Sequence, residues 1–294
     1  WLHNGKIDRS QTLFMSTDEK ETATETEKKP TGPPKSTARE YFESFVVTLI
    51  MALFGMTFIL QAVTVPTGSM QNTILVGDYL LVNKFIFTPG GHSLWFLPQR
   101  EIERGDIIVF KYPGNKLHPE MDRAHGASAT PYQVNYVKRV IGLPGETVEF
   151  RDNQVFINGE LLPEHRILGD PPVPGDQQSA LVTREFEDRK PNEKYSVYYS
   201  EEPMMEILAG GHLSRRDYEF AVPGKTMRVP DNSFFVMGDS RNNSEDSRYW
   251  GFVPRDLIIG RAMFVYWSCD RGASNGSMFG CISHPRLSRI GTLI

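Results

Sequence analysis

Ser69 lies in the turn Pro66–Met70, where its hydroxyl could act as a nucleophile. Pro66 ends a preceding helix, and Gly68 lets the backbone turn tightly beside the serine. A serine hydroxyl needs a nearby base before it can attack a carbonyl carbon. By itself the motif is weak, because a serine in a Pro/Gly turn is usually a turn residue and nothing more.

Lys138 is the candidate base, because the seven histidines are scattered and form no evident Ser/His/Asp arrangement. A lysine can serve as a base only if its pKa falls well below its usual ~10.4, and burial among apolar neighbours lowers it. In strand alternation Lys138 shares a face with Val134, Tyr136 and Val140, whereas Arg139 points the other way and stays solvated or paired. The alternative is an edge strand whose lysine reaches solvent.

A third candidate is the dense polar loop from Gly238 to Arg248, which follows an apolar segment and precedes aromatic residues. Asp246 and Arg248 are placed to form an ion pair, and a serine hydroxyl in this loop could hold a neutral lysine amine in line. The alternative is an ordinary solvated loop, but the flanking glycine and aromatic residues favour a packed site.

The element that precedes Ser69 is an uncharged apolar segment from Ser44 to Val63. A helix of this length roughly matches a ~30 Å hydrocarbon core, so we expect a transmembrane helix over residues 41–65. A buried soluble helix rarely stays uncharged for so long, and a cleaved signal peptide has a shorter apolar core. Basic residues precede the span and none follows until residue 84: Lys28, Lys29, Lys35 and Arg39. The positive-inside rule therefore places the N-terminus in the cytoplasm and the remainder outside.

Residues 1–40 are predicted to be a disordered cytoplasmic tail. Residues 16–38 consist mainly of Thr, Glu, Lys and Pro, with no apolar residue large enough to build a core. We expect the biological start at Met15, because an acidic, Thr-rich run follows it, and residues 1–14 are then not native.

The rest of the chain predicts a mostly β fold: a catalytic β domain from residues 66–162 and 228–294, with an inserted, more polar β region at 163–227. Segments rich in Val, Ile, Phe and Tyr between turn residues predict its strands. They are 78–87, 106–112, 134–141, 147–150, 233–237 and 257–267. Asn158-Gly159 predicts a two-residue hairpin turn within 154–162.

Composition excludes several classes of protein. The net charge of −4 gives no indication of nucleic-acid binding. Cys269 and Cys281 are the two cysteines, too few for a disulfide scaffold or a Cys-rich zinc site. They could form one disulfide outside the cytosol or remain two thiols. We expect no metal and no cofactor.

Taken in order, these motifs resemble bacterial type I signal peptidase (leader peptidase), a membrane protease with a Ser/Lys pair. The resemblance runs in separate blocks from about Val65 to Ile290, and several ordered blocks after an apolar span are far more specific than any one of them. The blocks are Pro66–Met70, Arg104–Phe110, Lys138–Glu146, Gly238–Pro254 and Leu287–Gly291.

The resemblance implies that Ser69 is the nucleophile and Lys138 the general base. It further implies that the Thr67 hydroxyl, where many members carry Ser, and the Ser69 backbone N–H hold the oxyanion. Ser244 corresponds to a serine that orients the lysine, and Asp239, Asp246 and Arg248 correspond to its supporting residues. The family preference for small residues at −1 and −3 implies shallow apolar pockets, expected to be lined by Val65, Pro66, Met70 and Val137.

The resemblance also implies an enzyme that removes signal peptides from exported preproteins. Its partners are then signal-peptide-bearing preproteins and membrane lipid, with no nucleic acid, and we expect a monomer. Its location would be the bacterial cytoplasmic (inner) membrane, single-pass, with the catalytic domain in the periplasm. Two rival functions are a self-cleaving Ser/Lys repressor and a non-catalytic membrane-anchored binding protein. The apolar anchor argues against the first, and the intact Ser69, Lys138 and Ser244 argue against the second.

Overall fold

The computed structural model describes residues 36–87, 98–124, 130–151, 154–170, 182–185, 188–199, 218–272 and 278–294. The expected tail before residue 36 lies outside these ranges. The chain separates into two compact units, Trp1–Thr48 and Leu49–Ile294, and the boundary falls within the first helix. The second unit carries every candidate site residue.

Helix α1 (Thr37–Phe54) begins inside the predicted tail and continues as a π-helical turn, η1 (Gly55–Ile59). Together they form a 23-residue segment whose most apolar 18-residue window has a mean hydropathy of 2.0, and none of that window is buried. Thr48 and Thr57 donate their hydroxyls to the carbonyls of Ser44 and Leu53 one turn earlier, so these polar groups are satisfied inside the helix. The segment is long and apolar enough to cross a membrane, as its sequence predicted.

The helix ends earlier than the predicted span 41–65. Leu60–Thr64 form strand β1, which pairs antiparallel with β2 (Asp78–Asn83). The helical prediction is therefore wrong beyond Ile59. Hydropathy measures how apolar these residues are, but it does not show that a neighbouring strand satisfies their backbone hydrogen bonds.

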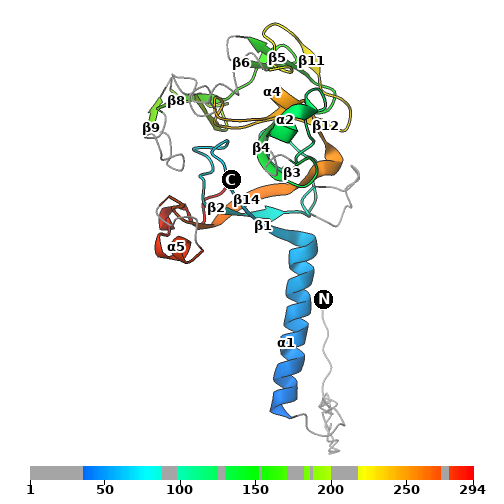
Figure 1. Ribbon diagram of the computed structural model, residues 1–294, viewed down its shortest axis with the longest axis vertical. Helices are drawn as coiled ribbons and strands as arrows, with labels where there is room; N and C mark the ends of the chain where they lie inside the picture. The colour runs from blue at the N-terminus through cyan, green and yellow to red at the C-terminus, as the bar shows by residue number, and fades with distance from the viewer. Residues whose placement is uncertain are drawn as a thin grey trace, which may run out of the picture. The chain divides into compact units, whose positions relative to one another are not determined.

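A seven-stranded sheet forms the centre of the second unit, in the order β1-β2-β14-β3-β4-β12-β13, with antiparallel neighbours throughout (Figure 1). Strands far apart in sequence meet here, because the last long strand lies between two early ones. The bounds are β3 (Ile107–Lys111), β4 (Asn135–Gly142), β12 (Ser233–Met237), β13 (Val253–Pro254) and β14 (Ile258–Ser268). The mostly β fold class is confirmed.

Two smaller sheets flank the main one. The first has the order β11-β5-β6-β7, and its predicted hairpin turn is present, with positive φ at Asn158 and Gly159. The second, β10-β8-β9, is supplied by the predicted insertion. The bounds are β5 (Thr147–Arg151), β6 (Gln154–Ile157), β7 (Glu160–Leu161), β8 (His165–Asp170), β9 (Val182–Glu185), β10 (Ser196–Tyr199) and β11 (Met227–Arg228). Short helical turns complete the described chain: α2 (Pro119–Ala124), α4 (Ser247–Trp250), η5 (Arg255–Leu257), α5 (Met278–Ser283) and η6 (Leu287–Arg289).

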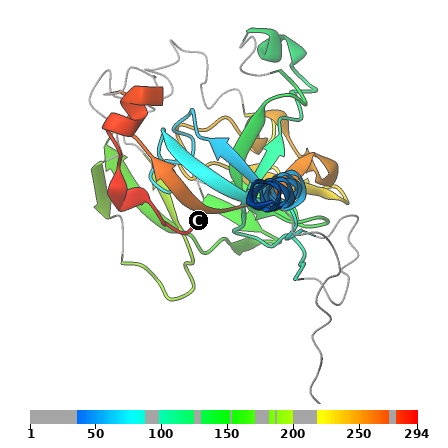
Figure 2. The same cartoon turned by 90° about the horizontal axis from the view of Figure 1, so that it is seen from below.

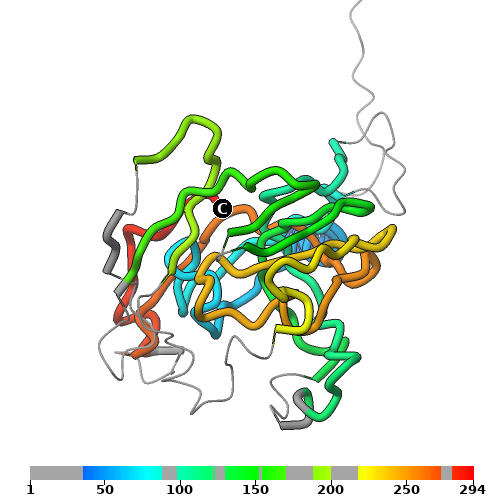
Figure 3. Tube along the Cα trace, turned by 90° about the horizontal axis from the view of Figure 1, so that it is seen from above, coloured from blue at the N-terminus to red at the C-terminus, as the bar shows by residue number. Residues whose placement is uncertain are grey.

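The apolar core divides into three clusters, one of which lies beneath the loop that carries Ser69. Val65, Met70 and Ile74 of that loop pack there with Leu80 of β2 and Val265 of β14. The β2 and β14 strands that hold this cluster pair with each other and lie side by side, as seen from below in Figure 2 and from above in Figure 3. The loop that carries Ser69 is therefore seated on core side chains rather than projecting freely into solvent.

Cys269 and Cys281 form a disulfide, which answers the question that their spacing left open. Cys269 directly follows β14, and Cys281 lies in α5, so the bond ties the C-terminal segment to the end of β14. Both residues are buried.

Candidate active site

Ser69 lies in the loop that joins β1 to β2. The Val65 N–H donates to Asp78 O at 3.0 Å, and the Gly77 N–H donates to Val65 O at 3.1 Å, which closes the loop at its base. Ser69 itself is 9% exposed, and its carbonyl accepts a hydrogen bond from the Ser240 N–H at 3.1 Å. The nucleophile candidate is thus held by backbone contacts on both sides.

Lys138 reaches Ser69 from strand β4. Its Nζ lies 2.7 Å from Ser69 Oγ, within hydrogen-bond distance, and the side chain is 4% exposed. Removal from water disfavours the ammonium form and lowers the pKa of Lys138 from 10.5 to about 8, although the nearby Asp246 and Glu245 carboxylates act in the opposite direction. A substantial share of the amine is then neutral near pH 8 and able to accept a proton.

An aromatic cluster borders this amine through the Tyr136 ring. The Tyr136 ring centroid lies 5.3 Å from Lys138 Nζ, on the face that strand alternation predicted. Tyr112 stacks on Tyr136 at 4.8 Å, and the Trp250 ring lies 5.5 Å from that of Tyr136. The Tyr136 ring therefore contributes to the burial of the amine, and burial is the main cause of the lowered pKa.

The polar loop is packed rather than solvated. Arg248 Nε and Nη2 donate to Asp246 Oδ1 and Oδ2, each at 2.8 Å, so the predicted ion pair is present and buried. Burial favours the neutral acid, but the Arg248 guanidinium beside it holds the pKa of Asp246 below its ordinary value. Ser244 donates its hydroxyl to Asp246 Oδ2 at 2.7 Å; the hydrogen bonds described for Ser244 and Lys138 do not join these two side chains directly.

Gly238 explains how closely this loop approaches Ser69, whereas its sequence position indicated only a packed flank. A Cβ at this position would collide with Ser244 Oγ and with the Ser69 carbonyl oxygen. Only a residue without a side chain permits that approach. The sequence feature that could have indicated this close approach is the Gly238-Asp239 pair, which directly follows an apolar strand.

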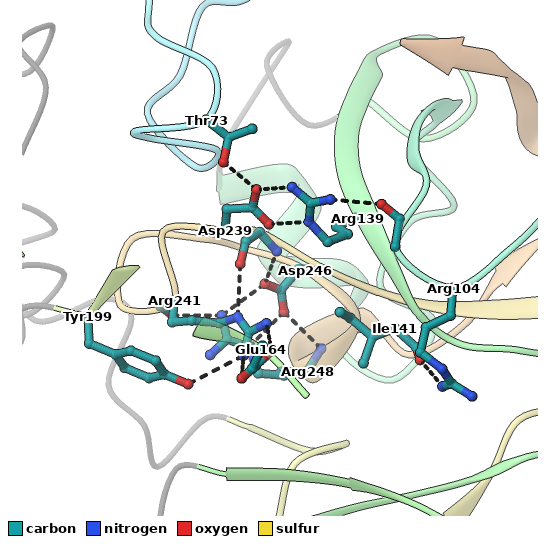
Figure 4. A network of polar contacts seen from close by, with 12 residues as sticks. Thr73, Arg104, Arg139, Ile141, Glu164, Tyr199, Asp239, Arg241, Asp246 and Arg248 are labelled. Atoms are coloured by element: carbon teal, nitrogen blue, oxygen red, sulfur yellow. Dashed lines mark hydrogen bonds and ion pairs between the residues drawn. The ribbon is translucent and has the colours of Figure 1, made fainter. Parts of the chain in front are cut away.

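Arg139 and Asp239 form a second buried ion pair, which Thr73 joins (Figure 4). The guanidinium donates two hydrogen bonds to the carboxylate, and Thr73 Oγ1 donates to Asp239 Oδ2 at 2.6 Å. Arg139 lies on the face opposite Lys138, as alternation predicted, and of the two predicted alternatives it is paired. Asp239 therefore connects β4 to the loop that carries Ser69.

The remaining predicted residues differ in exposure. Thr67 and Pro66 are exposed, and Val137 is half-buried. Val65 and Met70, which were expected to line the substrate pockets, are 3% and 1% exposed and belong to the core cluster under the loop. They can shape such a pocket from beneath but offer almost no open surface.

Glu164 and Arg241 form a third buried pair that sequence reasoning missed. Arg241 Nη1 and Nη2 donate to the two Glu164 oxygens at 2.6 and 2.5 Å, while Arg241 Nε donates to Gly238 O at 3.2 Å. The inserted region thus supports the polar loop, as Figure 4 shows. The partners are 77 residues apart, and no local pattern joins them.

The described residues contain no group of three or more His, Cys, Asp or Glu side chains placed to hold a metal ion.

Comparison with known proteins gives consistent results. Residues 38–267 match the family model described as "Signal peptidase, peptidase S26". The chain is 32% identical over 274 residues to signal peptidase I of Pseudomonas fluorescens, covering 86% of this chain and 78% of that protein. It is 32% identical over 254 residues to signal peptidase I of Aquifex aeolicus, covering 78% and 84%. A crystal structure of a signal peptidase I from Enterococcus faecalis is 26% identical, with a TM-score of 0.28, covering 55% of this chain and 97% of that one.

Proposed function

The chain belongs to the peptidase S26 family of signal peptidases, and we propose that Ser69 and Lys138 are its catalytic nucleophile and general base. It is a membrane-anchored serine endopeptidase that removes signal peptides from preproteins, and its family uses a Ser/Lys dyad. The observation that carries the assignment is the 2.7 Å separation of Lys138 Nζ and Ser69 Oγ inside a water-excluding site.

The reaction begins with transfer of the Ser69 proton to the neutral Lys138 amine as Oγ attacks the carbonyl carbon of the scissile bond. Lys138, now an ammonium, returns that proton to the departing amine, and the acyl-enzyme forms. The neutral lysine then removes a proton from water, which attacks the ester. The ammonium returns this proton to the departing Ser69 Oγ, so the signal peptide leaves with its new carboxyl terminus and both residues regain their starting forms. Burial makes this cycle possible, because an ordinary solvated lysine stays charged near neutral pH.

The Thr67 hydroxyl and the Ser69 N–H are the proposed oxyanion donors. Thr67 is exposed, so its hydroxyl can turn toward a bound substrate, and its position two residues before Ser69 supports the role. Pro66 and Val137 supply the open surface of the proposed pockets for small residues, with Val65 and Met70 beneath them.

Ser244, Asp246, Arg248 and Asp239 are proposed to position the base rather than to react. Ser244 and Arg248 fix the Asp246 carboxylate, which also accepts the Gly238 N–H at 2.9 Å. Ser244 therefore acts on the lysine through Asp246, whose negative charge favours the ammonium form of Lys138. The resemblance implied a serine that orients the lysine, and the bond to Asp246 supports an indirect form of that role.

The membrane arrangement is proposed from the charge asymmetry around the apolar helix. The N-terminus is cytoplasmic, the catalytic domain is periplasmic, and the membrane is the bacterial inner membrane. The disulfide is consistent with an oxidising compartment. We also propose a monomer, in contact with lipid through its anchor, and a division into a catalytic β domain (66–162 and 228–294) with an insertion (163–227).

The assignment is tested with the purified full chain in detergent and a preprotein substrate. Ser69→Ala and Lys138→Met should each abolish cleavage. Lys111→Met is the matched control, because Lys111 lies on the neighbouring strand β3, is exposed, and should be dispensable. Normal cleavage by either site variant would overturn the assignment.

A further inference from the structure

The C-terminal segment, residues 284–294, follows α5 and runs beside the nucleophile loop. We use this name for residues 65–77, which join β1 to β2 and carry Ser69. Its backbone pairs with the last part of β14 and the residues that follow: the Arg286 N–H donates to Ser268 O, and the Gly291 N–H to Val265 O, each at 2.8 Å. Figures 1 and 2 show α5 and the chain end next to β14. Two arginines of this segment reach across to the loop between Ser69 and β2.

Arg289 binds both ends of the Thr73–Asp78 segment. Its Nη2 donates to Thr73 O at 3.0 Å and to Asp78 Oδ2 at 2.5 Å. Asp78 is fully buried, and its other oxygen accepts the Ser268 hydroxyl at 2.6 Å. One guanidinium therefore fixes the distance between the two ends of this segment.

Arg286 binds the middle of the same segment. Its Nη2 donates to Val76 O and, at 2.5 Å, to Cys269 O. The Cys269 N–H donates to Gly77 O at 3.1 Å, and a Cβ on Gly77 would collide with the Cys269 carbonyl oxygen. Cys269 thus touches the loop with its backbone while its sulfur is bonded to α5.

We propose that the Cys269–Cys281 disulfide closes a clamp, formed with Arg286 and Arg289, which holds the nucleophile loop so that Ser69 stays in its reactive position. The disulfide fixes α5 against the end of β14, so it limits how far the segment carrying both arginines can move. This inference rests on the proposed function of Ser69. In the reaction, Arg286 and Arg289 are positioning residues, because they act through the loop and do not contact the reacting atoms.

The clamp acts on the serine and not on the lysine. On its other side the loop is held by the Thr73 bond to Asp239 and by the Ser240 N–H bond to Ser69 O. Lys138 lies on β4, and the charged groups that act on its amine belong to residues 239–248. Opening the clamp should therefore displace Ser69 while leaving the environment of the lysine amine in place.

The test is reduction of the native full-length enzyme in detergent, followed by alkylation of the two thiols and measurement of preprotein cleavage. Mass spectrometry establishes that both thiols are alkylated. We expect kcat to fall at least fivefold, KM to stay within twofold, and the pH at half-maximal activity to stay unchanged. Reduction without alkylation, followed by reoxidation, should restore kcat.

Two variants complete the test. Cys269→Ala/Cys281→Ala should show the lowered kcat and no further response to reductant, and Arg289→Gln should lower kcat with the disulfide intact. Leu287→Ala is the matched control, because Leu287 is on the same segment and is 68% exposed. Its kcat should equal that of the wild type.

Alkylated enzyme that keeps kcat within twofold of the oxidised form would overturn the proposal. So would a loss of kcat that accompanies loss of the folded circular dichroism spectrum, because that result means general unfolding. Failure of the proposed function gives a different result, because the Ser69→Ala variant with its disulfide intact would then still cleave the preprotein.

Discussion

Arg139 and Asp239 are joined by two parallel hydrogen bonds, 2.7 Å from Nε to Oδ1 and 2.6 Å from Nη2 to Oδ2, in the buried interior. Arg139 directly follows Lys138, and Asp239 directly follows Gly238. The pair therefore fixes the strand that carries the base against the loop that supports it. The same carboxylate also accepts a hydrogen bond from Thr73 of the nucleophile loop. One buried charge pair therefore connects the nucleophile loop, strand β4 and the polar loop.

Removal of one member of this pair should destabilise the fold. Asp239→Asn leaves the Arg139 guanidinium buried without its counter-charge, and such changes cost about 3–5 kcal/mol. Chemical unfolding followed by tryptophan fluorescence measures the loss. Arg139→Met/Asp239→Leu removes both charges and should recover part of it. A loss below about 1 kcal/mol for Asp239→Asn would contradict a structural role for the pair.

The pH profile of cleavage should follow the ionisation of Lys138. Its pKa is lowered to about 8 by burial, and only the neutral amine can accept the Ser69 proton. We expect kcat/KM to rise about tenfold per pH unit below pH 8 and to level off above it. A preprotein whose own charge does not change over this range is the suitable substrate. A profile that is flat between about pH 6 and pH 9 would count against a lysine base.

Stability should depend on pH through the same group. The folded-state pKa of Lys138 lies below the ordinary 10.5, so the unfolded chain binds more protons between about pH 8 and 10.5, and stability rises across that window. Lys138→Met lacks this dependence. Below pH 8 the variant should be more stable than the wild type by about 3 kcal/mol, and the difference should vanish above pH 10.5. Equal slopes of stability against pH in the two proteins would refute the burial argument.

Gly238→Ala should inactivate the enzyme with the dyad intact. The added Cβ would push against Ser244 Oγ and the Ser69 carbonyl, and a displacement near 1 Å can cost about 100-fold in rate. Steady-state kinetics on a preprotein measures kcat/KM. Gly55→Ala is the control, because a Cβ there has no atom within 4 Å, and its activity should be normal.

Local periodicity and the order of the motifs predicted the main strands, one turn and the faces on which the site residues lie. Alternation placed Lys138 on the aromatic face and Arg139 on the opposite one, and the Asn158-Gly159 turn and the main strands were predicted close to their observed bounds. The apolar helix was predicted too, but not its end at Ile59. Hydropathy alone does not distinguish a strand such as β1 from the end of a helix.

The contacts that join distant segments could not be predicted in this way. Glu164 and Arg241, or Asp78 and Arg289, are common residue types without a local pattern, and only the folded topology brings them together. The burial of Val65 and Met70 was missed for a similar reason. Their position beside Ser69 indicated a substrate pocket, while the core beneath the loop is built from β2 and β14.

The central claim is that neutral Lys138 activates Ser69, and trapping the acyl-enzyme tests it most directly. The full-length enzyme is mixed with a peptide ester ending in small residues, quenched in acid, digested and analysed by mass spectrometry. The account predicts an acyl group on the peptide containing Ser69, none in Ser69→Ala, and formation slowed about 1,000-fold in Lys138→Met. Acylation of a different residue, or an unchanged rate in Lys138→Met, would contradict it.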